Sequence, residues 1–278
     1  MKKLVLTGAA GSLGSYLREP LVHQAGELVS TDIVDDIGKL YPGESYMKAD
    51  LASLDDMVNV LQGADMVVHM GAHVDEGSFE KLLGPNFIGA YNIWEAAYRN
   101  GLKRVIYASS IHAVGMYPKN QFIDTEVGHR PDTLYGLAKC FAEDLGSLYW
   151  DKRGLESVHM RILSCSPVEN ARALGSWLSY DDLIKLTVRC INTPVTGFAV
   201  VYGVSNNDRA PVDNSKASFL GYRPKDNAEQ FAAKILAEEP SIDPNDPLHM
   251  CHGGPLASVE LGHSYLSQMN SIDDTNKT

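Results

Sequence analysis

The chain opens with a short apolar run that leads directly into three regularly spaced glycines. Residues 3–7, Lys-Leu-Val-Leu-Thr, have the composition of a buried parallel strand. Gly8, Gly11 and Gly14 follow at the spacing of a turn between a strand and a helix. Such a turn lets the backbone approach a pyrophosphate while free helix amides face the anion. The pattern predicts a dinucleotide-binding strand–turn–helix unit, and a glycine-rich turn without a ligand is the alternative.

A second expected strand ends in an acidic residue. Residues 27–31 read as this strand, and Asp32 follows about 20 residues beyond the glycines, where a carboxylate accepts hydrogen bonds from ribose hydroxyls. A carboxylate there would repel a 2′-phosphate, and no Arg follows in residues 33–36 to receive one. The pattern therefore predicts NAD rather than NADP. Pro20, inside the intervening helix, predicts a kink or an early end.

Strands and helices continue to alternate, which predicts an α/β fold: a Rossmann-type, doubly wound parallel sheet with its site at the carboxyl edge. The expected strands are residues 46–49, 65–70 and 103–108, and the expected helices are 54–61 and 86–97.

Beyond about residue 160 the alternation is less regular. A capped helix is expected over 179–191, a strand over 198–203 and a closing helix over 227–237. We expect an NAD-binding Rossmann core in residues 1–160. A small C-terminal substrate lobe, integrated into the same folded unit, is expected in 161–270, and a frayed tail in 271–278.

A tyrosine and a lysine at helical spacing follow the strand that ends in Ser109 and Ser110. Tyr135 and Lys139 lie four residues apart and share one helix face, so the ammonium can favour the ionised phenol. An unperturbed phenol titrates near about 10, and a nearby cation brings it toward a useful pKa for a base. Ser110 would then hold a substrate hydroxyl against Tyr135. A solvated helix face is the alternative reading.

Net charge and the distribution of cysteines limit the classes of partner and the compartment that we expect. The formal net charge is -11 and the isoelectric point is near 5.2, which argues against nucleic acid or an anionic membrane as a partner. The four cysteines are scattered without a Cys-x-x-Cys pair, and we see neither a secretory leader nor an apolar run long enough to span a bilayer. We expect a cytoplasmic protein with small-molecule partners and no metal. The run His249–His252 offers possible ligands but has no matching pair elsewhere.

The chain resembles the extended short-chain dehydrogenases/reductases. Motifs that carry this likeness are residues 7–14, Asp32, Asp50-Leu51, the helix with Asn86, Gly89 and Asn92, Ser109-Ser110, and Tyr135 with Lys139. Further segments resemble one branch, the uronate dehydrogenases: residues 108–118, 130–132, 134–141, 161–165, 177–179, 213–214 and 219–229. The resemblance implies NAD-dependent oxidation of the C1 hydroxyl of a hexuronic acid, such as glucuronate or galacturonate, to the aldarolactone. Proteins of this kind are commonly homo-oligomers.

The resemblance also implies roles for individual residues. Tyr135 would be the base, Lys139 would hold the ribose and lower the pKa of the phenol, and Ser110 would bind the reacting hydroxyl. His112 and Ser164 would contact the sugar, and Arg172 would pair with the uronate carboxylate. The implied cofactor contacts, besides Tyr135 and Lys139, are Gly8, Gly11, Ser12, Leu13, Gly14, Asp32, Ile33, Asp50, Leu51, Gly71, Ala72, Asn86 and Ile162. For Asp50 a helix cap is an equal alternative to a contact with adenine.

Two departures from the family pattern concern the substrate. Ile111 stands where the family usually has Asn, and Val74 stands where it has a substrate-contacting Ser. Losing polar groups at these positions should change or relax specificity without abolishing the chemistry. Open alternatives are a dehydrogenase of another anionic or neutral aldose, a nucleotide-sugar epimerase or dehydratase, and a non-enzymatic NAD-sensing regulator.

Overall fold

A single parallel sheet forms the centre of the protein in the computed structural model, which describes residues 1–238 and 247–265. Its seven strands follow the order β3-β2-β1-β4-β5-β6-β7, and every neighbouring pair is parallel. The predicted Rossmann-type fold is confirmed. The strands are β1 (Lys3–Thr7), β2 (Glu27–Asp32), β3 (Glu44–Lys48), β4 (Met66–His69), β5 (Arg104–Ser110), β6 (Glu156–Ile162) and β7 (Phe198–Gly203).

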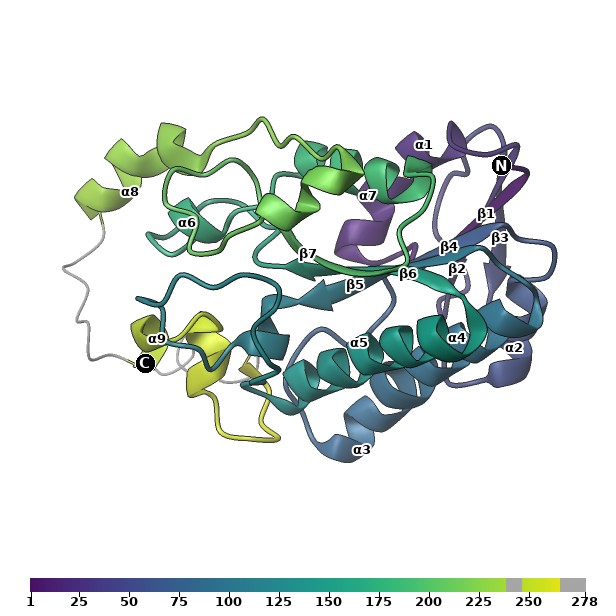
Figure 1. The fold of residues 1–278 in the computed structure, drawn as a ribbon, viewed down its shortest axis with the longest axis horizontal. Helices are drawn as coiled ribbons and strands as arrows, with labels where there is room; N and C mark the ends of the chain where they lie inside the picture. Colours follow the sequence, from purple (N-terminus) through teal and green to yellow (C-terminus); the bar gives the residue numbers. More distant parts are fainter. Residues whose placement is uncertain (239–246, 266–278) are drawn as a thin grey trace.

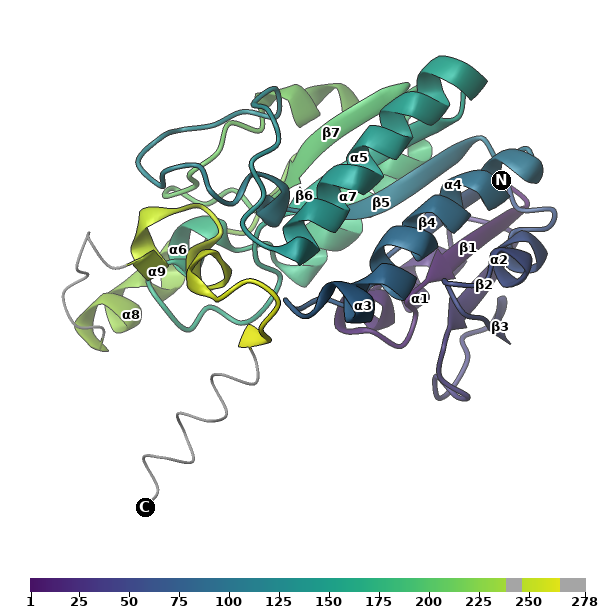
Figure 2. The same cartoon turned by 90° about the horizontal axis from the view of Figure 1, so that it is seen from below.

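Helices cover both faces of the sheet (Figure 1). On one face lie α1 (Ser12–Val22) and α7 (Tyr180–Asn192), and on the other lie α2 (Leu54–Val60), α4 (Gly89–Arg99) and α5 (Leu134–Arg153). Figure 2 shows the second layer in front of the strands. Shorter helices are α3 (Phe79–Leu82), α6 (Ala173–Ser176), α8 (Ala232–Glu238) and α9 (Pro247–Met250).

The core is split between the two faces because side chains alternate along each strand. In β1, Leu4 and Leu6 pack with residues of α1 and α7, whereas Val5 packs with residues of α2, α4 and α5. All three are fully buried. Burial on both faces explains why these strands are apolar runs in the sequence.

The direction in which successive strands are added to the sheet reverses beside β1. From β1 the chain moves outward to β2 and β3, then returns to β4 on the other side of β1. The loops after β1 and β4 therefore diverge and leave a crevice at the carboxyl ends of the strands, where open α/β sheets bind ligands.

Some elements differ from the sequence-based expectation. The helix expected over 86–97 is a π-helical turn, Leu83–Ile88, followed by α4; Pro85 in this turn has no N–H to donate. The helix over 227–237 begins as a 3₁₀ turn, Ala228–Phe231. Helix α1 continues through Pro20 and ends two residues later, at Val22. The tail expected over 271–278 lies outside the described residues.

β6 and β7 show how closely the predicted lobe joins the core. β7 lies within residues 161–270, yet it pairs with β6 along its whole length.

Within residues 1–238 and 247–265, no helix has the length and apolar character needed to cross a bilayer.

Candidate active site

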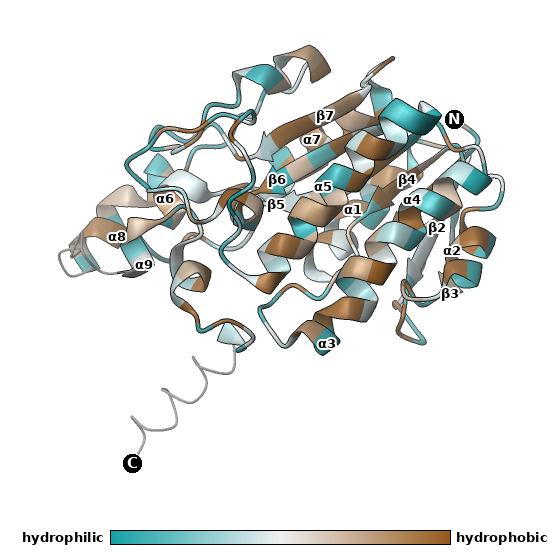
Figure 3. Cartoon of the chain, turned by 60° about the horizontal axis from the view of Figure 1, so that its bottom comes forward, coloured by the Kyte–Doolittle hydropathy of each residue, from teal (hydrophilic) through white to brown (hydrophobic). Residues whose placement is uncertain are grey.

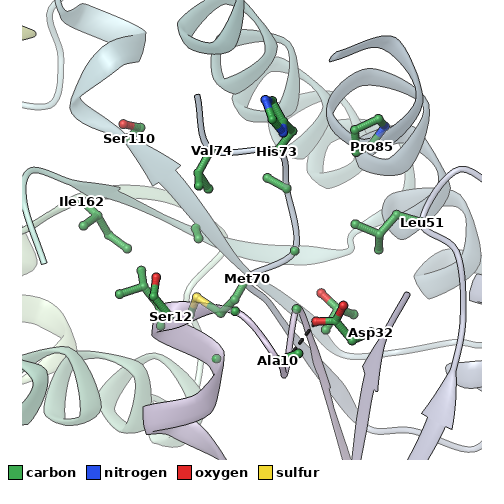
Figure 4. A pocket seen from close by; sticks show the side chains of 18 of the residues that line it. Ala10, Ser12, Asp32, Leu51, Met70, His73, Val74, Pro85, Ser110 and Ile162 are labelled. Carbon is green, nitrogen blue, oxygen red and sulfur yellow. Dashed lines mark hydrogen bonds between the residues drawn. The ribbon is translucent and has the colours of Figure 1, made fainter. Parts of the chain in front are cut away.

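A cavity of about 730 Å³ occupies the crevice at the carboxyl ends of the strands (Figure 4). Its walls come from the glycine turn after β1, the end of β2, the loop after β4, the end of β5 and the start of α5. Most of the predicted site residues line it: Gly8, Gly11, Ser12, Leu13, Gly14, Asp32, Ile33, Asp50, Leu51, Gly71, Ala72, Val74, Ser110, His112, Tyr135, Lys139 and Ile162.

The glycine turn is packed too tightly for side chains. Gly8 has φ +70°, and a Cβ there would lie 2.5 Å from the backbone N of Gly71. At Gly14 a Cβ would lie 2.0 Å from the carbonyl oxygen of Gly8, so α1 rests directly on the turn. In the described part of the chain no side chain caps α1, which begins after Gly11. Its first amides are available to an anion, and the turn therefore fits a pyrophosphate.

Asp32 is held in place at the end of β2. Its Oδ2 accepts a hydrogen bond from the backbone N of Ala10 at 2.9 Å, which Figure 4 marks, and its Oδ1 accepts from Ile33 N at 2.7 Å. A carboxylate oxygen has more than one acceptor site, so a sugar hydroxyl can still donate to it. This geometry suits a ribose.

Asp50 lines the cavity but does not cap α2. The cap is Ser53, whose side chain accepts from Asp56 N. Asp50 instead accepts from Ala52 N at 2.8 Å within its own turn.

Ser110, Tyr135 and Lys139 converge at the inner end of the cavity. Ser110 ends β5, while Tyr135 and Lys139 share one face of α5, which Thr133 caps by accepting from Gly136 N. The ammonium of Lys139 donates to the carbonyl oxygen of Ala108 at 2.7 Å. It lies 5.3 Å from the ring centroid of Tyr135.

Burial dominates the ionisation of this cluster. It raises the pKa of Tyr135 to about 12, although a hydrogen bond with Ser110 acts to lower it. Burial also lowers the pKa of Lys139 to about 7, against the charge of Glu143. The predicted lowering of the Tyr135 pKa by Lys139 is not seen in this geometry, because burial outweighs the hydrogen bond with Ser110 and the ammonium of Lys139 is directed to Ala108.

The side chains expected at the sugar differ in their surroundings. His112 is oriented by Asp132, whose Oδ2 lies 2.7 Å from the ring Nδ1. Val74 is 67% exposed, and Figure 4 shows it pointing into the cavity. Ile111 is 1% exposed and packs with Val114, Ile123 and other apolar side chains. Of the two apolar residues that stand where the family has polar ones, only Val74 lines the cavity of about 730 Å³, which we call the main cavity.

Two predicted contacts have other partners. Asn86 is absent from both cavity linings; its amide accepts from the backbone N of His73 at 2.8 Å and donates to the His73 carbonyl oxygen at 2.9 Å. It therefore fixes the loop after β4, which carries Val74. Ser164 also lies outside both linings, and its hydroxyl is 3.2 Å from that of Ser166.

Arg172 lies in a second cavity of about 200 Å³. Ile111, Lys119, Arg209 and His252 line it too, and Leu163 lines both cavities, so the two adjoin. One nitrogen of Arg172 donates to the carbonyl oxygen of His252 at 3.1 Å. Arg209 is already paired with Glu229 at 2.8 Å.

Several lining residues were not predicted. Pro85, Met70 and Cys165 lie next to predicted segments and could have been found by extending them. Leu256 could not, because it reaches the cavity from the 3₁₀ turn Gly254–Ser258, far along the chain. Just before this turn, His252 N donates to the carbonyl oxygen of Tyr117 at 3.0 Å, and Nε2 of His252 is 2.8 Å from the carbonyl oxygen of Gln121.

A buried ion pair lies behind the site. Glu143 is 1% exposed and accepts two hydrogen bonds from Arg161, at 2.7 and 3.0 Å. Its other contacts are Ser109 Oγ at 2.5 Å and His129 Nε2 at 2.9 Å. Burial raises the pKa of Glu143, but the hydrogen bonds from His129 and Arg161 outweigh it and hold the pKa at about 2. The pair thus joins β5, β6 and α5 beneath the cavity.

Glu143→Gln should lower the free energy of unfolding by about 3 kcal/mol at pH 7, because it leaves Arg161 buried without its counter-ion. The folded pKa of Glu143 lies below its ordinary value of 4.5, so its contribution is present above that pH and is lost as the pH falls toward 2. Urea unfolding at pH 7 and pH 3 should show the gap to the wild type narrowing in acid. Glu229→Gln, in an exposed pair with Arg209, is the control and should have little effect. A gap that stays constant or widens in acid would contradict this assignment.

Together, the parallel sheet, the glycine turn and the Ser110–Tyr135–Lys139 cluster define a dinucleotide-binding α/β enzyme of the Rossmann type. The chain belongs to the NAD dependent epimerase/dehydratase family, whose family model matches residues 4–196.

Individual relatives cover nearly the whole chain. It is 42% identical to the uronate dehydrogenase of Pseudomonas putida over 92% of this chain and 95% of the relative. Identity to the uronate dehydrogenase of Agrobacterium fabrum is 43%, over 91% of this chain and 96% of the relative. Among solved structures, the uronate dehydrogenase from Agrobacterium tumefaciens superposes with a TM-score of 0.89 at 41% identity, covering 94% of this chain and 98% of that one. A mutant of that enzyme was solved in complex with NAD.

Proposed function

We propose that the protein oxidises the C1 hydroxyl of a hexuronic acid, such as glucuronate or galacturonate, to the aldarolactone, with NAD as cofactor and Tyr135 as base. The observation that carries the proposal is the convergence of Ser110, Tyr135 and Lys139 in the cavity that the glycine turn and Asp32 also line. Identities of 42–43% to three uronate dehydrogenases along more than nine-tenths of the chain support the substrate class.

Each side chain has a distinct task in this reaction. Ser110 holds the C1 hydroxyl beside Tyr135, and the phenolate of Tyr135 accepts its proton. Lys139, held by Ala108, places a positive charge near the developing phenolate and the ribose. His112, oriented by Asp132, binds a sugar hydroxyl. NAD, when bound along the glycine turn, supplies the hydride acceptor.

Arg172 is the proposed partner of the uronate carboxylate. Its planar guanidinium suits a carboxylate, and its cavity adjoins the one that contains Ser110 through the shared wall at Leu163. Arg172, beyond Ile162, would thus add recognition of the carboxylate to the sugar contact made by His112.

A substrate panel tests the proposed function directly. Purified protein and NAD are mixed with free hexuronates, neutral aldoses, sugar phosphates and nucleotide sugars, and reduced cofactor is followed by absorbance. We expect reduction with a hexuronate. Reduction only with a neutral aldose or a sugar phosphate would show that the substrate is not a hexuronate, and the apolar Val74 in the cavity would agree with that result. Conversion of a nucleotide sugar without net reduction of NAD would favour an epimerase instead.

Asp32→Ala should raise the KM for NAD about tenfold, because a ribose hydroxyl loses a charged acceptor. Discrimination against NADP should fall as well, since the carboxylate that repels a 2′-phosphate is gone. Initial rates with both cofactors measure the effect. Asp35→Ala removes an exposed carboxylate that pairs with Lys48 and serves as the control. Unchanged cofactor preference in Asp32→Ala would contradict the assigned role.

The proposal extends to assembly and location. Figure 3 shows that apolar residues alternate with polar ones along α4 and α5. Tyr91, Tyr98, Leu137, Phe141 and Leu148 are exposed there by 36–51%. An apolar face of this kind supports a homo-oligomer. All four cysteines are free, which favours a reducing cytoplasm.

A further inference from the structure

Glu76 is a fully buried carboxylate in the loop after β4, two residues beyond Val74. Its Oε2 accepts a hydrogen bond from the backbone N of Tyr135 at 3.1 Å, and its Oε1 accepts from Gly262 N at 2.8 Å. Among the residues that the structure describes, it forms no ion pair. One carboxylate thus joins the start of α5 to the C-terminal segment, residues 252–265.

The contact with α5 suits a negative charge. Tyr135 lies in the first turn of α5, where backbone N–H groups lack helical partners and the helix dipole favours an anion. Thr133 already satisfies Gly136 N at 2.9 Å, and Glu76 satisfies Tyr135 N. Glu76 therefore acts on the backbone of the residue whose phenol faces Ser110.

The contact with the C-terminal segment does not stand alone. Next to Glu76, Asp75 accepts hydrogen bonds from Ser264 Oγ at 2.5 Å and from Tyr265 N at 3.2 Å. Asp75 is 5% exposed. At its other end the segment is anchored near the site, since Gly253 N donates to the carbonyl oxygen of Gly115 at 2.9 Å.

Between these two anchors, Leu256 reaches the main cavity. Figure 2 shows the segment lying across the end of the molecule that carries the start of α5. Glu76 is thus bonded both to the backbone of Tyr135 and to the segment that brings Leu256 to the cavity.

We propose that Glu76 is a positioning residue that holds Tyr135 and the C-terminal segment in register, so that the cavity is covered only when the base is in place. The inference rests on the proposed oxidation of a hexuronate. A carboxylate is required because two N–H donors approach its two oxygens, whereas an amide offers one acceptor and places a donor against the other N–H. Leaving a buried N–H without an acceptor is costly.

Glu76→Gln is the test variant, and Glu260→Gln, the same chemical change at an exposed position of the C-terminal segment, is its control. We expect Glu76→Gln to lower kcat/KM for the hexuronate at least tenfold and the dissociation constant of NAD, measured without sugar, to change less than twofold. Amide hydrogen exchange should accelerate at Tyr135 and Gly262 together, with the strands of the core unchanged. Glu260→Gln should match the wild type in all three measurements.

Three results would overturn the proposal: kinetics of Glu76→Gln equal to those of Glu260→Gln, faster exchange at only one of the two amides, or faster exchange throughout the core strands. Exchange and NAD binding need no turnover, so they test Glu76 even if the wild type oxidises no hexuronate. Should Glu76→Gln not fold, Asp75→Asn replaces it. That variant should accelerate exchange in residues 262–265 and raise the KM for the sugar about threefold with kcat retained, and wild-type behaviour would reject the coupling.

Discussion

Tyr135→Phe should lower kcat about 1000-fold, within the range that a positioned acid–base group supplies, and leave NAD binding nearly unchanged. The variant keeps the ring and its contacts but loses the only phenol that lines the main cavity in the described part of the chain. Steady-state rates with a hexuronate and fluorescence titration with NAD measure the two effects. Tyr149→Phe, which removes a buried hydroxyl bonded to Glu95, is the matched control and should keep its rate within about twofold of the wild type.

The pH dependence of the rate, compared between the wild type and Tyr135→Phe, gives a second test of this role. Burial raises the pKa of Tyr135 to about 12, so only a small fraction is phenolate at pH 7 and this fraction grows as the pH rises. The wild-type rate should therefore increase from pH 6 to about pH 7 and level off above it, because Lys139, whose pKa is about 7, loses its charge as more of Tyr135 ionises. The residual rate of Tyr135→Phe should not follow this rise. A Phe variant with wild-type turnover would exclude Tyr135 as the base and revive a non-catalytic role for the fold.

Arg172→Leu should raise the KM for a hexuronate about 100-fold, the range expected when one partner of a buried charge pair is truncated. A neutral aldose, if it is oxidised at all, should be unaffected because it has no carboxylate to lose. Arg209→Leu is the control, since Arg209 lines the same cavity but is already paired with Glu229. Equal losses with charged and neutral sugars would show that Arg172 supports the fold of the lobe instead of binding the carboxylate.

Local patterns were sufficient to predict the nucleotide-binding half. The glycines, Asp32 and the Tyr135/Lys139 pair lie on single strands or turns of helix, and their spacing places them without knowledge of distant contacts. The alternation of strands and helices predicts that the sheet is parallel. All of these residues line one cavity.

The substrate half depends on contacts between distant segments, which no local pattern encodes. Ile111 is buried because Ile123, Tyr202 and Val212 pack around it, and only the first of these lies nearby in sequence. Leu256 enters the cavity because residues 252–265 return to the loops after β4 and β5. Asn86 serves the loop around His73 instead of the cavity lining because an amide can bind both groups of a peptide at once.

The different burial of Val74 and Ile111 decides where substrate scope can be engineered. A library at position 74 would alter the cavity wall at little cost in folding, because that side chain is 67% exposed. The same library at position 111 should cost more in folding stability, since that side chain is 1% exposed and packs in an apolar cluster where it also borders the Arg172 cavity. Directed evolution toward new sugars should therefore begin in the loop after β4 and leave the turn after β5 untouched.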